Sequence, residues 1–330
     1  WAVFYESGLR RQNSDVNLTQ AQIAKDRARL EADPIEWISF FFPEYCKFEF
    51  AVFQIKAIRR CIKHEEWFEV LSWARGLAKS TTVMFIVMYL ALTKKKCNVM
   101  MASATQDSAV RLLDPYKKQF EENAMIRAYY GVQVNLGNWC AEEFVAKCGC
   151  SFRAVGAGNA PRGSRNGAVR PDVLLVDDFD TDADCRNPDI LKKKWEWFEE
   201  ALFPTRSISE DLLVIFCGNL IALDCCVKRA GDKADHWDIV NIRDKDGKSS
   251  WPEKNTEERI NRIQSKISTK AFQQEYMNNP LSEGDTFKEM VWGKCPPLSK
   301  LQFAVVYGDP APSNSKNKAT SFKACFLIGY

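Results

Sequence analysis

At 330 residues and 46% hydrophobic composition, the chain is long enough for one large core and a second, smaller unit. Basic and acidic residues nearly balance at a formal net charge of +3, so any contact with nucleic acid must depend on local charge. No apolar stretch approaches the roughly 20 residues that cross a bilayer, no secretory signal pattern begins the chain, and the 12 cysteines lack CxxC spacing, which argues for a soluble intracellular protein with reduced cysteines.

The first part of the chain is polar, and its pattern predicts one helix over residues 21–30 within an N-terminal arm, residues 1–48. From Phe68 onward, short apolar runs alternate with helical stretches. The predicted strands are residues 68–73, 98–102, 173–176 and 212–217, and the predicted helices are residues 79–93, 106–122, 189–202 and 220–230. This alternation predicts an α/β fold with a mainly parallel sheet covered by helices on both faces.

Three further groups of elements complete the predicted organisation. Residues 142–147 and 151–155, separated by Gly149, predict a hairpin. A strand at residues 237–242 and helices at 255–266 and 269–278 predict a small appended subdomain, and residues 303–307 predict a final strand. We therefore expect a main domain over residues 49–222, a lid or linker subdomain over 223–300, and the start of another domain over 301–330.

The first predicted strand runs directly into residues 74–81, Ala-Arg-Gly-Leu-Ala-Lys-Ser-Thr, and then into an apolar helix. This is the order of a phosphate-binding loop, in which backbone N–H groups surround the phosphates of a nucleotide. Lys79 would lie between the outer phosphates and Ser80 would bind Mg²⁺, while Gly76, Ala78 and Thr81 would supply the rest of the loop. The strict GxxxxGK[ST] pattern is not met, because Trp73 and Ala78 occupy its two glycine positions. A capped, solvated helix start is the alternative interpretation of these residues.

The predicted strand at residues 173–176 ends in the paired carboxylates Asp177 and Asp178. This is the Walker B layout, in which a buried strand delivers a first carboxylate to Mg²⁺ and a second one orients water toward the terminal phosphate. Asp177 would hold the metal and Asp178 would be the catalytic base, with Asp180 as an alternative to Asp178. An acidic solvated loop is the simpler interpretation. A Lys-Ser loop and an acidic strand end in one chain, with strand–helix units between them, together favour an NTPase.

The loop Arg75-Gly76-Leu77-Ala78-Lys79-Ser80 resembles the phosphate loop of the large terminase family of tailed bacteriophages. The resemblance implies an additional-strand P-loop NTPase, with Gln54 as the residue that recognises adenine and Arg75 as the leading catalytic arginine. Residues 214–219, Val-Ile-Phe-Cys-Gly-Asn, resemble the coupling motif of the family, which makes Asn219 the sensor of the terminal phosphate. Residues 272–280 resemble the segment that precedes the nuclease domain of the family, and we interpret this segment structurally, as packing and a helix stop at Pro280.

Residues 304–311, Ala-Val-Val-Tyr-Gly-Asp-Pro-Ala, are similar to the first strand of the ribonuclease-H-like nuclease of the family. The resemblance implies that Asp309 is the first ligand of a two-metal site holding Mg²⁺ or Mn²⁺, and that the chain stops early in the nuclease domain and cannot cut DNA by itself. A strand-to-turn exit is the simpler interpretation of Gly-Asp-Pro. The departures from the family are Asp178 in place of Glu and Asn219 in place of Thr or Ser.

A catalytic arginine is expected because charge on the transferring phosphoryl group needs a fixed cation. Arg75 could act in its own subunit or reach a neighbour in a ring. Arg162, Arg165 and Arg170 are rivals, because they lie in the Gly-rich stretch of residues 156–171. Such a long loop could equally contact DNA phosphates.

The resemblance implies an ATP-driven motor that moves double-stranded DNA into a viral procapsid. Its expected partners are double-stranded DNA, the portal protein, the small terminase subunit and further copies of itself in a ring on the portal. Its expected location is the cytoplasm of the host cell, without a membrane anchor. Two alternatives remain at this point: a helicase-like DNA-dependent ATPase, and a non-hydrolysing assembly module attached to a nuclease.

Overall fold

The computed structural model describes residues 19–161, 163, 165–280, 297, 300–309 and 324–329. The chain forms two compact units, Trp1–Ser282 and Glu283–Tyr330. Within the described residues, the helices are too short or too polar for any of them to cross a membrane, and every cysteine has a free thiol.

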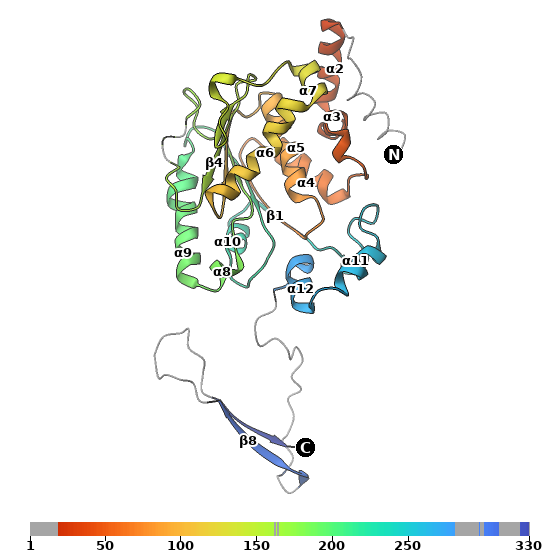
Figure 1. Ribbon diagram of the computed structural model, residues 1–330, viewed down its shortest axis with the longest axis vertical. Helices are drawn as coiled ribbons and strands as arrows, with labels where there is room; N and C mark the ends of the chain where they lie inside the picture. Colours follow the sequence, from red (N-terminus) through yellow and green to blue (C-terminus); the bar gives the residue numbers. More distant parts are fainter. Residues whose placement is uncertain are drawn as a thin grey trace. The chain divides into compact units, whose positions relative to one another are not determined.

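Seven strands form the central sheet of the first unit, in the order β3-β4-β2-β5-β6-β1-β7 (Figure 1). Neighbouring strands are parallel except for the antiparallel pair β3–β4. The strands are β1 Trp67–Trp73, β2 Asn98–Ser103, β3 Glu143–Val145, β4 Ser151–Gly156, β5 Val173–Val176, β6 Leu213–Cys217 and β7 His236–Val240. The predicted mainly parallel sheet and the predicted hairpin are confirmed.

Strand β7 belongs to this main sheet, where it pairs parallel to β1 from Glu69 and His236 to Trp73 and Val240. The prediction that this strand lies in the appended subdomain was therefore wrong. Its residues are only partly buried because β7 is an edge strand. An edge strand shows less of the continuous apolar pattern that marks a central parallel strand.

Helices α2 to α7 pack together on one face of the sheet. Among them α5 is apolar on all sides, and every residue from Thr82 to Leu92 is buried. A helix of this kind is stable only when other elements surround it, and α5 packs against α3, α4 and α6 as well as against the sheet. The six are α2 Gln20–Ala32, α3 Pro34–Phe41, α4 Val52–Lys63, α5 Lys79–Leu92, α6 Gln106–Glu122 and α7 Ala124–Tyr130.

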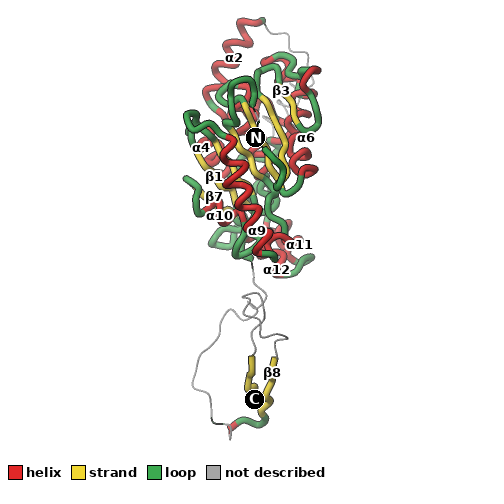
Figure 2. Tube along the Cα trace, turned by 90° about the vertical axis from the view of Figure 1, so that its left-hand side faces the viewer, coloured by secondary structure: helices red, strands yellow, loops and turns green. Residues whose placement is uncertain are grey.

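A separate apolar cluster covers the opposite face. It contains α9 (Pro188–Trp197), the π-helical turn Phe198–Leu202 and α10 (Cys226–Gly231), and Figure 2 shows α9 lying in front of the strands. The helix predicted over residues 220–230 begins only at Cys226. The carboxylate of Asp180 accepts hydrogen bonds from the N–H groups of Cys226 and Val227, both at 2.9 Å, and this fixes the start of α10.

Helices α11 (Glu257–Gln264) and α12 (Thr269–Met277) follow β7, and each begins at a hydroxyl N-cap. Helix α12 ends at Asn278, whose side-chain amide donates to the carbonyls of Ser72 and Val240 at 2.9 and 3.3 Å. This places the end of α12 beside the ends of β1 and β7.

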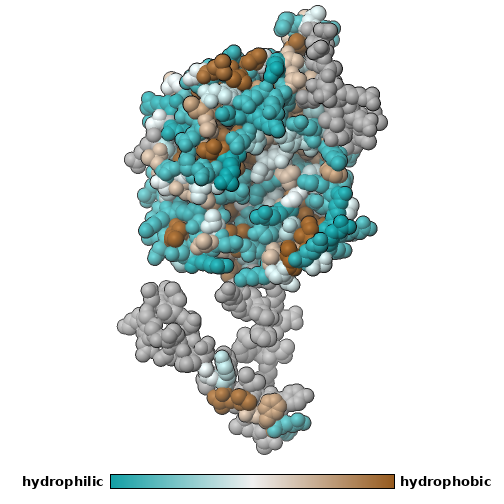
Figure 3. Space-filling model, in the orientation of Figure 1, coloured by the Kyte–Doolittle hydropathy of each residue, from teal (hydrophilic) through white to brown (hydrophobic). Residues whose placement is uncertain are grey.

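On the face of the first unit shown in Figure 3, the surface is largely hydrophilic, with hydrophobic side chains in small separate groups. The second unit contains the antiparallel pair β8 (Ala304–Asp309) and β9 (Ala324–Gly329).

Candidate active site

The parallel strands β1, β5 and β6 end at the same edge of the sheet, so the loops that follow them lie together. These loops, together with Lys254 and Glu275 from later in the chain, line a cleft of about 620 Å³. The residues lining it are Trp73, Ala74, Arg75, Gly76, Ala78, Lys79, Ser80, Thr81, Asp178, Phe179, Asp180, Thr181, Asp182, Gly218, Asn219, Ile221, Lys254 and Glu275.

The loop between β1 and α5, called the phosphate loop here after its predicted role, contains two residues with positive φ. Gly76 has a φ of 85°, and Ala78 has a φ of 59°, in the left-handed region that glycine adopts without strain. Helix α5 begins at Lys79 without a side-chain cap. Its first N–H groups therefore remain available to an anion, and the helix dipole adds positive potential at the same end.

Ser80 and Asp177 are in direct contact; Ser80 lines the cleft, and both residues line a smaller cavity next to it. The Ser80 hydroxyl donates to Asp177 Oδ2 at 2.6 Å, and the Asp177 side chain is almost fully buried. Burial raises the pKa of Asp177, whereas the nearby Lys79 ammonium and the Ser80 hydrogen bond lower it. The hydroxyl and carboxylate oxygens that meet here are the hard donors that Mg²⁺ prefers.

Asp178 follows immediately and is exposed to the cleft. Its φ of 48° turns the chain sharply after β5, and its carbonyl accepts hydrogen bonds from Ser103 Oγ at 3.2 Å and Ala104 N at 3.3 Å. The end of β2 thus holds the backbone of Asp178 in place. Asp180 is a poor substitute for it, because both Asp180 carboxylate oxygens bind the start of α10.

Asn219, at the end of β6, connects the phosphate loop to α12. Its Oδ1 accepts a hydrogen bond from Lys79 Nζ at 3.1 Å, and its Nδ2 donates to the carbonyl of Glu275 at 2.9 Å. The same Glu275 carbonyl accepts a hydrogen bond from Arg75 N at 3.1 Å. Arg75 and Asn219, which lie in two different loops of the cleft, therefore both donate to the main-chain carbonyl of Glu275 in α12.

The candidate catalytic arginines lie at different places relative to the cleft. Arg75 lines the cleft, where its Nε lies 2.5 Å from Glu275 Oε2. Arg165 and Arg170 flank a segment whose Val169 carbonyl binds Asn98, the first residue of β2, so they lie toward the edge of the sheet opposite the cleft. Arg162 lies outside the described residues. Within the described part of one subunit, Arg75 alone among these candidates faces the site.

Gln54 does not line the cleft. It is buried in α4, where its Oε1 accepts from Ala51 N at 2.9 Å and its Nε2 donates to the Leu77 carbonyl at 3.2 Å. Both ends of its amide are thus engaged with the protein. In this arrangement Gln54 supports the loop at Leu77, and its contact with adenine stays a prediction.

Two residues at the cleft were not identified as site residues from the sequence. Glu275 lies in the segment interpreted only as packing, and Lys254 lies in a loop without a recognised motif. The ammonium of Lys254 donates to the Gly76 carbonyl at 3.0 Å. No pattern in the sequence indicated this contact, because it depends on how residues 241–256 fold back toward the loop after β1.

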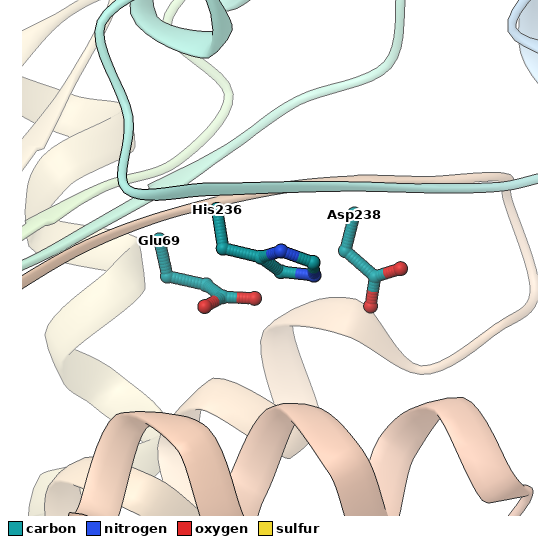
Figure 4. Close-up of side chains that lie close together, drawn as sticks. All are labelled: Glu69, His236 and Asp238. Carbon is teal, nitrogen blue, oxygen red and sulfur yellow. The ribbon is translucent and has the colours of Figure 1, made fainter. Parts of the chain in front are cut away.

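A second group of ionisable side chains lies between β1, β7 and α4. Glu69, His236 and Asp238 have possible ligand atoms within 4.8 Å of one another, and Figure 4 shows the three side chains on one side of the two strands. Arg60 of α4 already lies 2.6 Å from Glu69 Oε1 and 3.2 Å from Asp238 Oδ2. Because the guanidinium supplies the cation that these carboxylates need, we assign the group a structural role.

Asp309, the predicted nuclease ligand, is the last residue of β8. The backbone of β8 is described there, but the Asp309 side chain lies outside the described residues. Its role as a metal ligand stays a prediction.

Comparison with known proteins gives structural matches alone, since no protein-family model and no curated protein matches the sequence. The HK97 bacteriophage large terminase aligns with 13% identity and a TM-score of 0.52, over 76% of this chain and 55% of that protein. The large terminase of the thermophilic bacteriophage D6E in complex with ADP aligns with 14% identity and a TM-score of 0.43, over 85% and 65% of the two chains. The large terminase ATPase domain of Thermus phage P74-26 aligns with 15% identity and a TM-score of 0.42, over 68% and 93%.

The chain thus spans about half the length of the HK97 protein that it matches. The seven-stranded α/β architecture and the strand-end cleft agree with the expected P-loop fold. The chain has the fold of a bacteriophage large terminase.

Proposed function

We propose that this chain is the ATP-hydrolysing motor portion of a viral DNA-packaging enzyme. The observation that carries the proposal is the hydrogen bond between Ser80 and Asp177, beside Lys79 and at the uncapped start of α5. A hydroxyl on a phosphate loop and a carboxylate on a neighbouring strand are the pair that holds Mg²⁺ in P-loop NTPases. Their direct contact is difficult to explain for a solvated helix start and an unrelated acidic loop.

In this proposal the N–H groups of residues 76–81 bind the phosphates of ATP, and Lys79 moves its hydrogen bond from Asn219 to a phosphate oxygen. Ser80 and Asp177 would hold Mg²⁺, which supplies positive charge to the outer phosphates. Asp178 accepts a hydrogen bond from the attacking water and directs it at the terminal phosphate. Water adds to that phosphorus as the bond to ADP breaks, and Arg75 is positioned to stabilise the charge that develops.

The larger assembly is part of the same proposal and rests on the sequence resemblance together with the fold. Double-stranded DNA would be moved into a procapsid by a ring of these chains on the portal protein, with the small terminase subunit as a further partner, in the cytoplasm of the host cell. DNA cleavage is a further activity in this proposal, with Asp309 as the first metal ligand of the nuclease site.

Measurement of ATP hydrolysis tests the motor proposal directly. Wild-type protein should hydrolyse ATP only with Mg²⁺, and EDTA should abolish the activity. Lys79→Ala and Asp177→Asn should each lower kcat by about 100-fold or more, because each removes a charge that stabilises the transferring phosphoryl group. Lys147→Ala, an exposed lysine outside the cleft, is the control and should remain active.

The same measurements separate the alternatives. Binding of Mg·ATP without hydrolysis would favour the assembly module, whereas no Mg²⁺-dependent binding at all would overturn the nucleotide site. A packaging motor should also require procapsids for DNA uptake, and strand separation of duplex DNA by the protein would favour the helicase-like alternative.

A further inference from the structure

The segment from Trp251 to Asn255 lies against the phosphate loop and carries a lysine into the cleft. Lys254 Nζ donates to the Gly76 carbonyl at 3.0 Å, and Asn255 Nδ2 donates to the same oxygen at 3.3 Å. Lys254 lines the same cleft as Lys79. The cleft therefore receives one lysine from α5 and a second one from the region after β7.

The position of Lys254 is fixed by its neighbours. Trp251 is buried and its indole donates to the Glu49 carbonyl at 2.8 Å. The backbone then turns, with the N–H groups of Lys254 and Asn255 both bonded to the Trp251 carbonyl, and Lys254 Nζ lies 4.7 Å from the centre of the Trp251 ring. Arg259 completes the anchoring by donating to the Lys254 carbonyl at 2.7 Å.

The charge of Lys254 has no acidic partner among the described residues. Its pKa is lowered by burial alone, with no carboxylate contributing an opposing attraction. Arg75 in the same cleft differs, because it is paired with Glu275. A half-buried ammonium that donates only to a neutral carbonyl is poorly compensated, and an anion entering the cleft would provide the missing charge.

On the basis of the proposed function, we propose that Lys254 is a second phosphate-binding lysine, which contacts the phosphate chain of ATP and ties nucleotide binding to the segment after β7. Two features of the geometry favour this role. Lys254 can turn to a phosphate oxygen without breaking an ion pair. When it does so, Asn255 still donates to the Gly76 carbonyl, so the phosphate loop keeps a hydrogen bond at that position.

Titration with a non-hydrolysable ATP analogue and Mg²⁺ tests this inference in the full chain. Lys254→Ala should weaken binding about tenfold or more, since a hydrogen bond between charged groups contributes at least that factor. Adenosine, which has no phosphate, should bind the variant and the wild type equally. Lys245→Ala removes an exposed lysine from the same region outside the cleft and should bind the analogue like the wild type.

A glutamine variant distinguishes charge from support of the loop. Lys254→Gln can still donate to the Gly76 carbonyl but cannot neutralise a phosphate, so it should bind the analogue as weakly as Lys254→Ala, while Lys254→Arg should recover most of the affinity. Full affinity in Lys254→Gln would overturn the inference, because a neutral hydrogen bond would then be sufficient. Thermal unfolding of each variant verifies that the protein is folded.

The inference and the proposed function fail in different ways. If the wild type does not bind the analogue, the proposed function itself is wrong. If the wild type binds and Lys79→Ala does not, unchanged binding by Lys254→Ala overturns the role of Lys254 alone.

Discussion

The side-chain amide of Asn219 donates a hydrogen bond to the main-chain carbonyl of Glu275 at 2.9 Å. The other end of the same amide accepts from Lys79 at 3.1 Å. One side chain therefore spans the distance between the lysine of the phosphate loop and helix α12. In the proposed function Lys79 turns to a phosphate, and Asn219 would then lose one of its two partners. We therefore expect α12 to respond to nucleotide binding through its hydrogen bond with Asn219.

Asn219→Ala should lower kcat for ATP hydrolysis by about tenfold or more, because the variant loses a polar group at the reacting end of the cleft. Affinity for an ATP analogue should change much less, since Lys79 and the loop N–H groups remain. Steady-state kinetics and titration measure the two quantities separately. Asn138→Ala, an exposed asparagine outside the cleft, is the control, and an unchanged kcat in Asn219→Ala would rule out the coupling role.

Ala78→Gly should stabilise the protein by about 1 kcal/mol, because alanine is strained at the positive φ of this position and glycine is not. The backbone of the loop should stay the same, so affinity for Mg·ATP should be unchanged. Urea unfolding gives the stability. The matched control, Ala128→Gly within α7, should destabilise the protein by about 1 kcal/mol, since glycine is unfavourable inside a helix. A loss of stability in Ala78→Gly would contradict the assigned conformation.

The sequence predicted the centre of the fold well because the central strands and helices have strong patterns. Strand β5 is a fully buried apolar run that ends at two aspartates, and its predicted bounds agree with the structure. Helix α6 has an amphipathic pattern and a threonine N-cap, and its bounds also agree. Lys79, Ser80, Asp177 and Asn219 were assigned to one nucleotide site, and the loops that carry them do meet because parallel strands end at one edge.

The parts that were missed depend on contacts between distant segments. The start of α10 is set by Asp180, a residue far away in the sequence. Gln54 was expected in the cleft, but its amide is taken up by the loop that it supports. Lys254 reaches Gly76 through a fold of the chain that no local pattern records.

Gln54→Ala should weaken the binding of ATP and GTP analogues by the same factor, about fivefold to tenfold, because the variant loses the hydrogen bond to Leu77 that supports the loop. A contact with adenine would instead give a selective loss for the ATP analogue. Parallel titrations with the two analogues decide between these roles. A selective loss would restore the role predicted from the sequence and would require Gln54 to exchange its present partners when nucleotide binds.

The cluster of Arg60, Glu69 and Asp238 gives a prediction about stability rather than catalysis. Glu69 is fully buried, and Arg60 is the cation that neutralises it. Arg60→Met should destabilise the protein by about 3 kcal/mol, because it leaves a buried carboxylate without its cation and with only the hydrogen bond from the Trp67 indole. Arg59→Met, an exposed neighbour on the same helix, should change stability by less than about 0.5 kcal/mol.

The same variant tests why we assign Glu69, His236 and Asp238 a structural role. Zn²⁺ or Mn²⁺ should raise the thermal midpoint of the wild type less than that of Arg60→Met, because the guanidinium occupies the carboxylates in the wild type, whereas binding at Ser80 and Asp177 is common to both proteins. Arg60→Met frees Glu69 and Asp238 from the guanidinium, and metal bound by them and by His236 should raise the midpoint of this variant by restoring the missing positive charge. An equal rise in the two proteins would contradict the idea that Arg60 keeps metal out of this group.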